Sequence, residues 1–198
     1  MKALFPLSRP LMIAGFSILL TLPLFSEAQT KFEGANLAVA VTGTSSLHNW
    51  EMKSTKAQCN AVITMGNDKI SFSNLSFSVP VESLKSGKAS MDKNAYKAMD
   101  SKKNAGISFT IASAKSIAAT SLNTYLFSGM GKLTINGVTK TTPMVATLKY
   151  NPTDKSFTCT GTKSFKMSEY GVKPPTAVFG TIKTGDAISI NYAIRIKS

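Results

Sequence analysis

The amino-acid sequence predicts an all-β protein, an eight-stranded antiparallel barrel with one short helix between its third and fourth strands. Three observations lead to this prediction. Apolar residues recur at every second position along most of the chain, which is the period of strands that bury one face. Turn-forming residues separate these runs at the spacing of hairpins. A single segment, residues 90–101, has the spacing of a helix instead.

The alternating runs define eight predicted strands. In the last of them, apolar side chains alternate with Ser, Asn, Ala, Arg and Lys, so that one face is apolar and the other is mostly polar. The predicted ranges are 35–44, 50–65, 69–80, 106–116, 122–135, 138–150, 155–168 and 186–197.

The third predicted strand changes its apolar phase partway along. Ile70 and Phe72 occupy one phase, whereas Phe77 occupies the other. One extra residue in a strand reverses the direction of the side chains that follow it. We therefore expect a β-bulge near Ser73 or Asn74.

Short turns are expected to join the strands. The pair Asn136-Gly137 stands between two apolar runs, and a two-residue type I′ hairpin prefers Asn-Gly because both residues need positive φ. The other predicted turns lie at residues 65–68, 121–123, 151–154 and 184–186.

Residues 90–101 interrupt the strand pattern with a predicted helix. Asp92 lies in its first turn and two lysines follow its last turn, which suits the helix dipole at both ends. A helix beside the mouth of the barrel could control access to the interior. The apolar side chains that share one helix face are Met91, Ala95, Ala98 and Met99.

Strands with one apolar face each bury that face most simply by closing into a barrel, which also removes the sheet edges. Eight strands leave an interior that is either just filled by side chains or wide enough for one small ligand. The inward candidates mix aromatic side chains with Ala and Ser neighbours, so both outcomes stay open. The aromatic candidates are Phe72, Phe77, Phe109, Phe127, Phe157 and Phe165.

Residues 1–28 have the features of a secretory signal. Lys2 and Arg9 precede an apolar run over residues 11–25, and small residues follow it. This run is shorter than the roughly 20 apolar residues of a membrane-spanning helix. We therefore expect a removed signal at residues 1–28, one domain at residues 29–198, and a periplasmic or secreted location.

Composition excludes several classes of function. The chain is 43% apolar and 17% charged, with 23 Lys+Arg against 10 Asp+Glu and a formal charge of +13. One His and two Cys are too few for most metal sites or nucleophilic triads, and the sequence has no glycine-rich phosphate loop. We therefore predict a protein that is not an enzyme and that uses no cofactor, catalytic residue or metal.

The basic charge is carried almost wholly by lysine. Arg195 is the only arginine after residue 28, and lysine lacks the planar fork that reads phosphates and guanine edges. This pattern disfavours nucleic acid as a partner. A lysine-rich exterior suits a solubilising, edge-protecting surface, and it also suits contact with an anionic membrane.

The sequence favours free thiols at Cys59 and Cys159 over one disulfide, and the alternative that they pair stays open. An oxidising compartment permits a disulfide, but these residues fall on the second and seventh predicted strands, which are not neighbours in sequence. A disulfide needs Cα atoms within about 7 Å, and strands across a barrel are usually further apart. Neither cysteine has the basic or His context of a reactive thiolate.

Four short motifs give the chain a resemblance to a known family. They are Leu133–Lys140 (LTINGVTK) at the predicted central hairpin, Ser83–Gly87 before the helix, Gly106–Phe109 after it, and Ser168–Val172 toward the end. In these motifs and their order, over most of residues 33–197, the chain resembles the YceI-like lipid or polyisoprenoid-binding proteins. The resemblance implies an extended lipocalin-like barrel with a helix near its mouth. It also implies export to the periplasm and an apolar channel that holds a long isoprenoid chain without catalysing a reaction.

Residues 43–50 depart from the family pattern. They contain the only His and the only Trp of the chain, His48 and Trp50, between the first two predicted strands. An aromatic face and an imidazole could contact a ligand head group, or both side chains could pack locally. Both alternatives stay open.

The candidate ligand-binding residues combine these two with inward-facing strand positions and helix positions: Phe72, Phe77, Met91, Tyr96, Phe109, Phe127, Leu133, His48 and Trp50. Two functions fit the sequence. In the first, an isoprenoid quinone or polyprenyl lipid occupies a hollow barrel. In the second, the barrel has a filled core, and its basic surface contacts an anionic membrane or an acidic partner.

Overall fold

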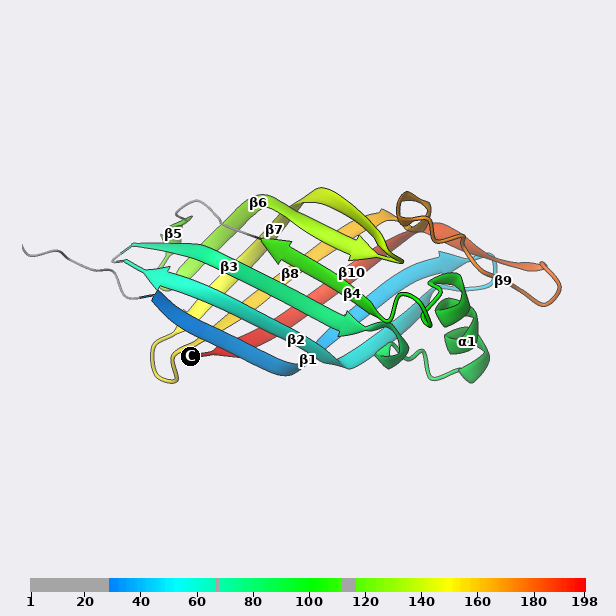
Figure 1. Cartoon of the computed structure of the whole chain (residues 1–198), viewed down its shortest axis with the longest axis horizontal. Helices are drawn as coiled ribbons and strands as arrows, with labels where there is room; N and C mark the ends of the chain where they lie inside the picture. Colours follow the sequence, from blue (N-terminus) through cyan, green and yellow to red (C-terminus); the bar gives the residue numbers. More distant parts are fainter. Residues whose placement is uncertain (1–28, 67, 112–116) are drawn as a thin grey trace, which may run out of the picture.

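Eight strands close into an antiparallel barrel in the computed structural model, which describes residues 29–66, 68–111 and 117–198 (Figure 1). The strands follow the order β1-β2-β3-β4-β6-β7-β8-β10, and β1 pairs with β10 to close the wall. The predicted eight-stranded barrel is therefore confirmed. The strands are β1 (Gln29–Ser45), β2 (Trp50–Met65), β3 (Lys69–Pro80), β4 (Gly106–Ile111), β6 (Thr124–Ile135), β7 (Val138–Asn151), β8 (Ser156–Lys166) and β10 (Ile182–Lys197).

Two short strands extend the wall at opposite ends of the barrel (Figure 1). β5 (Ile117–Ser121) pairs with β3 and β6 at one end, which we call the closed end. β9 (Thr176–Ala177) pairs with β10 at the other end, which we call the mouth. The predicted strand 106–116 is represented by β4, which ends at Ile111, and residues 112–116 lie outside the described residues.

The predicted helix is present between β3 and β4 and stands at the mouth (Figure 1). α1 (Ala89–Ala98) ends before residue 101 because Asp100 adopts a positive φ of 44°, which a helix does not accept. Its apolar face, including Met91 and Ala95, packs against the barrel core. Within the described ranges, no helix has the length and apolar character to cross a bilayer.

The β-bulge predicted in β3 is confirmed. Val62 of β2 pairs with Asn74, and the next residue, Ile63, pairs with Phe72. Ser73 is therefore the extra residue that reverses the apolar phase of the strand.

The hairpin predicted at Asn136-Gly137 is also confirmed. Both residues have positive φ, at 51° and 74°, and they join β6 to β7 as a type I′ turn requires. The predicted turns at 121–123 and 151–154 likewise separate strands, whereas the turn at 65–68 includes residue 67, which lies outside the described residues.

The turn predicted at residues 184–186 is wrong, because β10 begins at Ile182 and runs through it. Gly185 lies against Thr44 of β1, where a Cβ would approach the Thr44 hydroxyl oxygen to 2.4 Å. This glycine therefore permits close contact between two strands. A register shift opposite Gly43 and Ser45 accommodates the additional residues of β10.

The predicted strand 155–168 ends earlier than expected. β8 stops at Lys166, and a 3-10 turn, η2 (Met167–Tyr170), follows it. Glu169 accepts a hydrogen bond from the backbone N–H of Lys166, and Gly171 ends the turn with a positive φ of 68°. These contacts turn the chain away from the wall and across the mouth.

Aromatic side chains fill the barrel at the closed end. The fully buried Phe157 lies with its ring centroid 5.2 Å from that of Phe32 and 4.9 Å from that of Tyr150. Tyr125 adds a further ring at 6.4 Å. Tilted and edge-on aromatic pairs of this kind pack densely, so this end of the interior is occupied by side chains.

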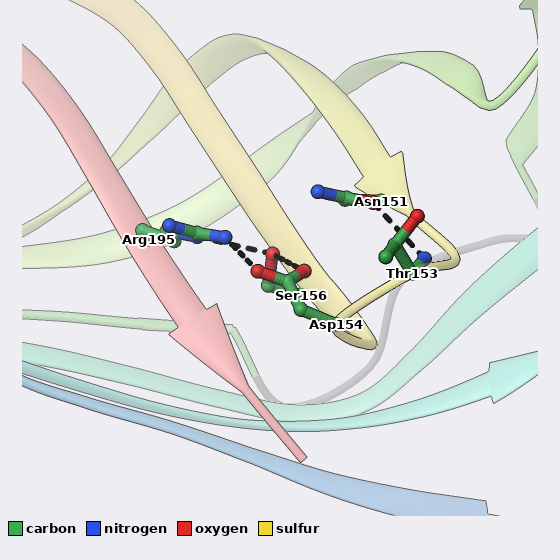
Figure 2. A network of polar contacts seen from close by, with 5 residues as sticks. All are labelled: Asn151, Thr153, Asp154, Ser156 and Arg195. Carbon is green, nitrogen blue, oxygen red and sulfur yellow. Dashed lines mark hydrogen bonds and ion pairs between the residues drawn. The ribbon is translucent and has the colours of Figure 1, made fainter.

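A polar network fastens the β7–β8 turn at the closed end (Figure 2). Arg195 of β10 forms an ion pair with Asp154 and donates a 3.1 Å hydrogen bond from Nε to the hydroxyl of Ser156. The Ser156 hydroxyl donates to the Asp154 carboxylate at 2.6 Å, and Asn151 accepts from the N–H of Thr153 at 3.0 Å. This arginine therefore connects the turn to the last strand.

Candidate ligand-binding site

A cavity of about 290 Å³ lies beneath α1 at the mouth, and we call it the mouth cavity. Three parts of the chain line it: the apolar face of α1, the turn between β1 and β2, and the segment from η2 to β9. Its walls are mostly apolar. They include Leu47, Met91, Ala95, Ala98, Met99, Ile107, Tyr170, Val172, Pro175 and Ile188.

A second cavity of about 110 Å³ lies deeper between the strands, and we call it the inner cavity. Its lining is almost wholly aliphatic and aromatic. Four side chains line both cavities, so the two lie next to each other along the barrel: Val41, Leu84, Ile107 and Ile190. The interior is therefore hollow toward the mouth and packed at the closed end.

Eight of the nine candidate ligand-binding residues line these cavities. The five strand residues surround the inner cavity, as their alternation predicts: Phe72, Phe77, Phe109, Phe127 and Leu133. Three others line the mouth cavity: His48, Trp50 and Met91.

Tyr96 lines neither cavity and instead holds α1 in place. Its hydroxyl lies 2.6 Å from the carbonyl oxygen of Leu84 and 3.0 Å from that of Glu82, with a hydrogen bond to each. Both acceptors belong to the segment around η1 (Val81–Ser83), which precedes the helix. Lys85 lies over the Tyr96 ring, with Nζ 5.0 Å from the centroid.

His48 lies in the turn between β1 and β2, and Trp50 begins β2. The indole N–H of Trp50 donates a 2.9 Å hydrogen bond to the carbonyl oxygen of Thr44, and its ring covers Gly43, where a Cβ would lie 2.3 Å from the ring. Nδ1 of the exposed His48 lies 2.6 Å from the carbonyl oxygen of Asn49. Both side chains therefore have local partners while they line the mouth cavity.

The two cysteines are free, and both line the inner cavity. Cys59 is buried and Cys159 is half-buried. Burial raises the pKa of each thiol to about 12, and the neighbouring Cys59 adds to the effect at Cys159. Both therefore stay protonated and apolar at neutral pH, in keeping with the cavity around them.

Two polar residues of the inner cavity are absent from the sequence-based candidates. Lys163 of β8 and Tyr192 of β10 both line it. The signal for Lys163 was available, because it shares the inward phase of β8 with Phe157 and Cys159, both of which are at least half-buried. In the described part of the chain, no three His, Cys, Asp or Glu side chains gather as a metal site would require.

Comparisons with known proteins agree with this architecture. None of the curated proteins matches the chain in sequence. Among solved structures, a polyisoprenoid binding domain from Saccharophagus degradans, implicated in plant cell wall breakdown, superposes with a TM-score of 0.62 at 7% identity, covering 86% of this chain and 99% of its own. BcnA of Burkholderia cenocepacia superposes with a TM-score of 0.58 at 19% identity, covering 79% of this chain and 95% of its own.

These two structural likenesses concern the fold alone. The sequence itself matches the model of the YceI-like domain over residues 26–196, which is nearly the whole chain. The chain therefore belongs to the YceI-like domain family.

Proposed function

We propose that this protein is a non-catalytic carrier that holds an isoprenoid lipid, such as a polyprenyl lipid or an isoprenoid quinone, inside its barrel. The observation that carries the proposal is the pair of adjoining apolar cavities, which begin at the mouth and stop at the aromatic cluster of the closed end. A one-ended apolar cavity suits a molecule with a long hydrocarbon tail. The polyisoprenoid binding domain from Saccharophagus degradans, which has the same fold, supports the same ligand class.

Most of the affinity in this proposal comes from burial of the tail. Apolar surface removed from water contributes roughly 25 cal/mol per Å², before the cost of ordering the chain is subtracted. The cavity-lining phenylalanines, together with Leu133, Met91 and Trp50, provide the contact surface. The alternative of a filled core is less well supported, because both cavities lie within the barrel.

We propose further that residues 1–28 direct export and are then removed, so that the carrier works in the periplasm or outside the cell. The basic start, the apolar run and the small residues of this segment support the proposal. Intact-mass analysis of the protein from its own cell would support it if the mature chain began near residue 29. A full-length mass in the cytoplasmic fraction would contradict it.

The mouth also has the features of a surface that touches a membrane. Leu47 of the β1–β2 turn and Val178 and Phe179 of the β9–β10 turn are 66%, 61% and 109% exposed. Lys88 lines the mouth cavity, and Lys183 lies on β10 where it pairs with β9. Exposed apolar tips beside lysines suit an anionic bilayer, into which the apolar tips insert. We propose that lipid enters and leaves at such a contact.

Extraction of the bound molecule tests the proposed function. The processed protein is purified without detergent from its own cell, extracted with organic solvent, and the extract is examined by mass spectrometry. A prenyl lipid in about equimolar amount would support the carrier. Recovery of no more lipid than from an unrelated exported protein of similar charge would overturn it.

A further inference from the structure

The backbone pairing between β7 and β8 covers only part of the two strands. These strands pair from Thr147 with Thr160 to Asn151 with Ser156, at the closed end. β7 nevertheless extends back to Val138, and β8 extends on to Lys166. We call the unpaired stretch, residues 142–146 opposite residues 161–165, the β7–β8 seam. Pro143 lies within it and has no N–H to donate to a neighbouring strand.

Two side chains cross the seam in place of backbone hydrogen bonds. Nζ of Lys163 donates a 2.9 Å hydrogen bond to the carbonyl oxygen of Pro143. The hydroxyl of Tyr192 donates a 3.1 Å hydrogen bond to the carbonyl oxygen of Val145. Tyr192 reaches this position over Gly161, where a Cβ would lie 2.3 Å from the tyrosine hydroxyl oxygen. The seam is therefore held by side chains that can exchange their acceptors without any change in the strands.

The aliphatic part of Lys163 lines the inner cavity, and its ammonium group lies at the seam, where its hydrogen bond to Pro143 is exposed. Among the described residues that line the inner cavity, it is the only one with a charged side chain. An ammonium group has three N–H donors, and in the described ranges Lys163 has one acceptor, Pro143, and no carboxylate within ion-pair distance. Two of its three N–H donors can therefore take a further acceptor at the seam.

Tyr192 supplies a second donor at the seam, because its acceptor, Val145, lies two residues along β7 from Pro143. Burial, with a contribution from Cys159, raises the pKa of Tyr192 to about 12, so its hydroxyl keeps its proton at neutral pH. Lys163 is half-buried and Tyr192 partly buried, so a group bound between them remains in reach of water at the seam. One ammonium and one hydroxyl donor at the edge of an apolar chamber match an anionic group that is attached to a hydrocarbon tail.

We propose that Lys163, assisted by Tyr192, binds the acidic head group, a phosphate or a carboxylate, of an amphiphile whose tail occupies the cavities toward the mouth. The proposal rests on the proposed carrier function and adds the charge of its ligand. The head group takes the place of the Pro143 carbonyl as the acceptor of Lys163, and the two strands keep their backbone pairing at the closed end.

Matched pairs of ligands test this inference. Quenching of Trp50, the only tryptophan and a residue of the mouth cavity, reports binding of geranylgeranyl phosphate, geranylgeraniol, palmitate and hexadecanol to the wild-type protein. We expect at least one anion to bind about 10-fold tighter than its alcohol, since a hydrogen bond between an ammonium and an acidic group is stronger than one to a neutral hydroxyl. The phosphate and carboxylate pairs show which acidic group is accepted. Added salt should weaken binding of the anions and leave binding of the alcohols unchanged.

Substitutions test whether Lys163 causes the preference for the anion over its alcohol. Lys163→Met should abolish the preference for the anion and retain binding of the alcohol, whereas Lys163→Arg should retain the preference. Lys149→Met, which removes an exposed lysine of β7, is the control for net charge and should behave as the wild type. If Lys163→Met does not fold, two measurements still test the inference: the salt dependence of anion binding by the wild type, and the preference for the anion in Lys163→Arg. Equal binding of anion and alcohol by the wild type, or a preference that survives Lys163→Met, would overturn the inference. Failure of every ligand to bind would instead overturn the carrier function.

Discussion

The hydroxyl of Tyr96 donates a hydrogen bond of 2.6 Å to the carbonyl oxygen of Leu84, and this contact joins the mouth helix to the rim of the barrel. The helix covers the mouth cavity with Met91, Ala95 and Met99. Together with the hydrogen bonds between Ser86 and Asp92, Tyr96 therefore holds in place a large part of the wall of the mouth cavity.

Tyr96→Phe should loosen the helix without unfolding the barrel. Loss of the hydrogen bonds should lower the free energy of unfolding by about 0.5–1.5 kcal/mol. We expect bound lipid to dissociate several-fold faster, as measured by transfer of a fluorescent polyene lipid to vesicles. Tyr150→Phe, which changes an aromatic residue of the closed end, is the control and should leave the dissociation rate unchanged. Equal rates for wild type and Tyr96→Phe would show that the helix does not limit release.

Asp92 should make the mouth sensitive to acid. Burial alone would raise the pKa of its carboxyl, but hydrogen bonds from the hydroxyl and N–H of Ser86, with the charge of Lys85, hold that pKa below its ordinary value. Ionised Asp92 therefore stabilises the fold above the unfolded-state pKa of about 3.9. This stabilisation is lost as the pH falls through the lower pKa of the folded state.

Asp92→Asn should accordingly flatten the fall in unfolding free energy as the pH is lowered from 5 to 2, measured by urea titration. Asp100→Asn, which removes a carboxylate paired with Lys103 at the other end of the helix, should change this slope less. A slope for Asp92→Asn identical to that of the wild type would refute the assignment.

The hollow interior can be tested by filling it. Ala146 lines the inner cavity, so Ala146→Phe has space for the larger ring and should reduce lipid uptake. Ala61 is 2% exposed and lines neither cavity, so Ala61→Phe should instead lower the free energy of unfolding by about 1–3 kcal/mol through overpacking. Chemical denaturation and lipid uptake are measured for both variants. Equal destabilisation with unchanged uptake would argue for a solid core.

The cysteines should report whether the inner cavity is occupied. Because burial raises the pKa of both thiols to about 12, iodoacetamide should modify Cys59 and Cys159 very slowly at pH 8 and faster as the pH rises. Mass spectrometry of the delipidated protein should show slow labelling that added prenyl lipid slows further. Rapid labelling of both thiols in the folded protein would contradict their placement.

Contact with membranes should depend on the tip of the mouth. Phe179→Asp should reduce sedimentation of the protein with anionic phosphatidylglycerol vesicles, because it replaces a fully exposed apolar ring with a negative charge. Leu122→Asp makes a similar change at the closed end, where Leu122 is 88% exposed, and should sediment as the wild type does. If both variants sedimented alike, the mouth would not be the contacting surface.

The sequence predicts which strand side chains point into the barrel, because successive side chains of a strand point to opposite faces. Phe109 and Leu133 follow this rule and line the inner cavity. Lys163 obeys the same rule on β8, yet its charge suggests an outward position, and composition alone does not reveal an inward lysine. Alternation is therefore a better guide than polarity to the side chains that line the interior of a barrel.

The mouth was harder to predict, because its walls depend on contacts between loops that are distant in sequence. The hydroxyl of Ser46 accepts a hydrogen bond from the N–H of Lys183, which brings the β1–β2 turn to β10. Tyr170 and Val172 enter the cavity wall only because η2 turns the chain across the opening. Neither contact has a local sequence pattern, whereas the hairpin at Asn136-Gly137 has one.

Closure of the wall by β1 and β10 places Glu33 opposite Lys197, so both ends of the folded domain emerge beside each other and far from the mouth (Figure 1). An affinity tag, a fluorescent fusion or a surface tether at either end would leave the opening unobstructed. A short peptide linker between residues 198 and 29 would also allow circular permutation, with new ends cut at the β7–β8 turn. The attachment point and the opening of the barrel therefore lie at opposite ends.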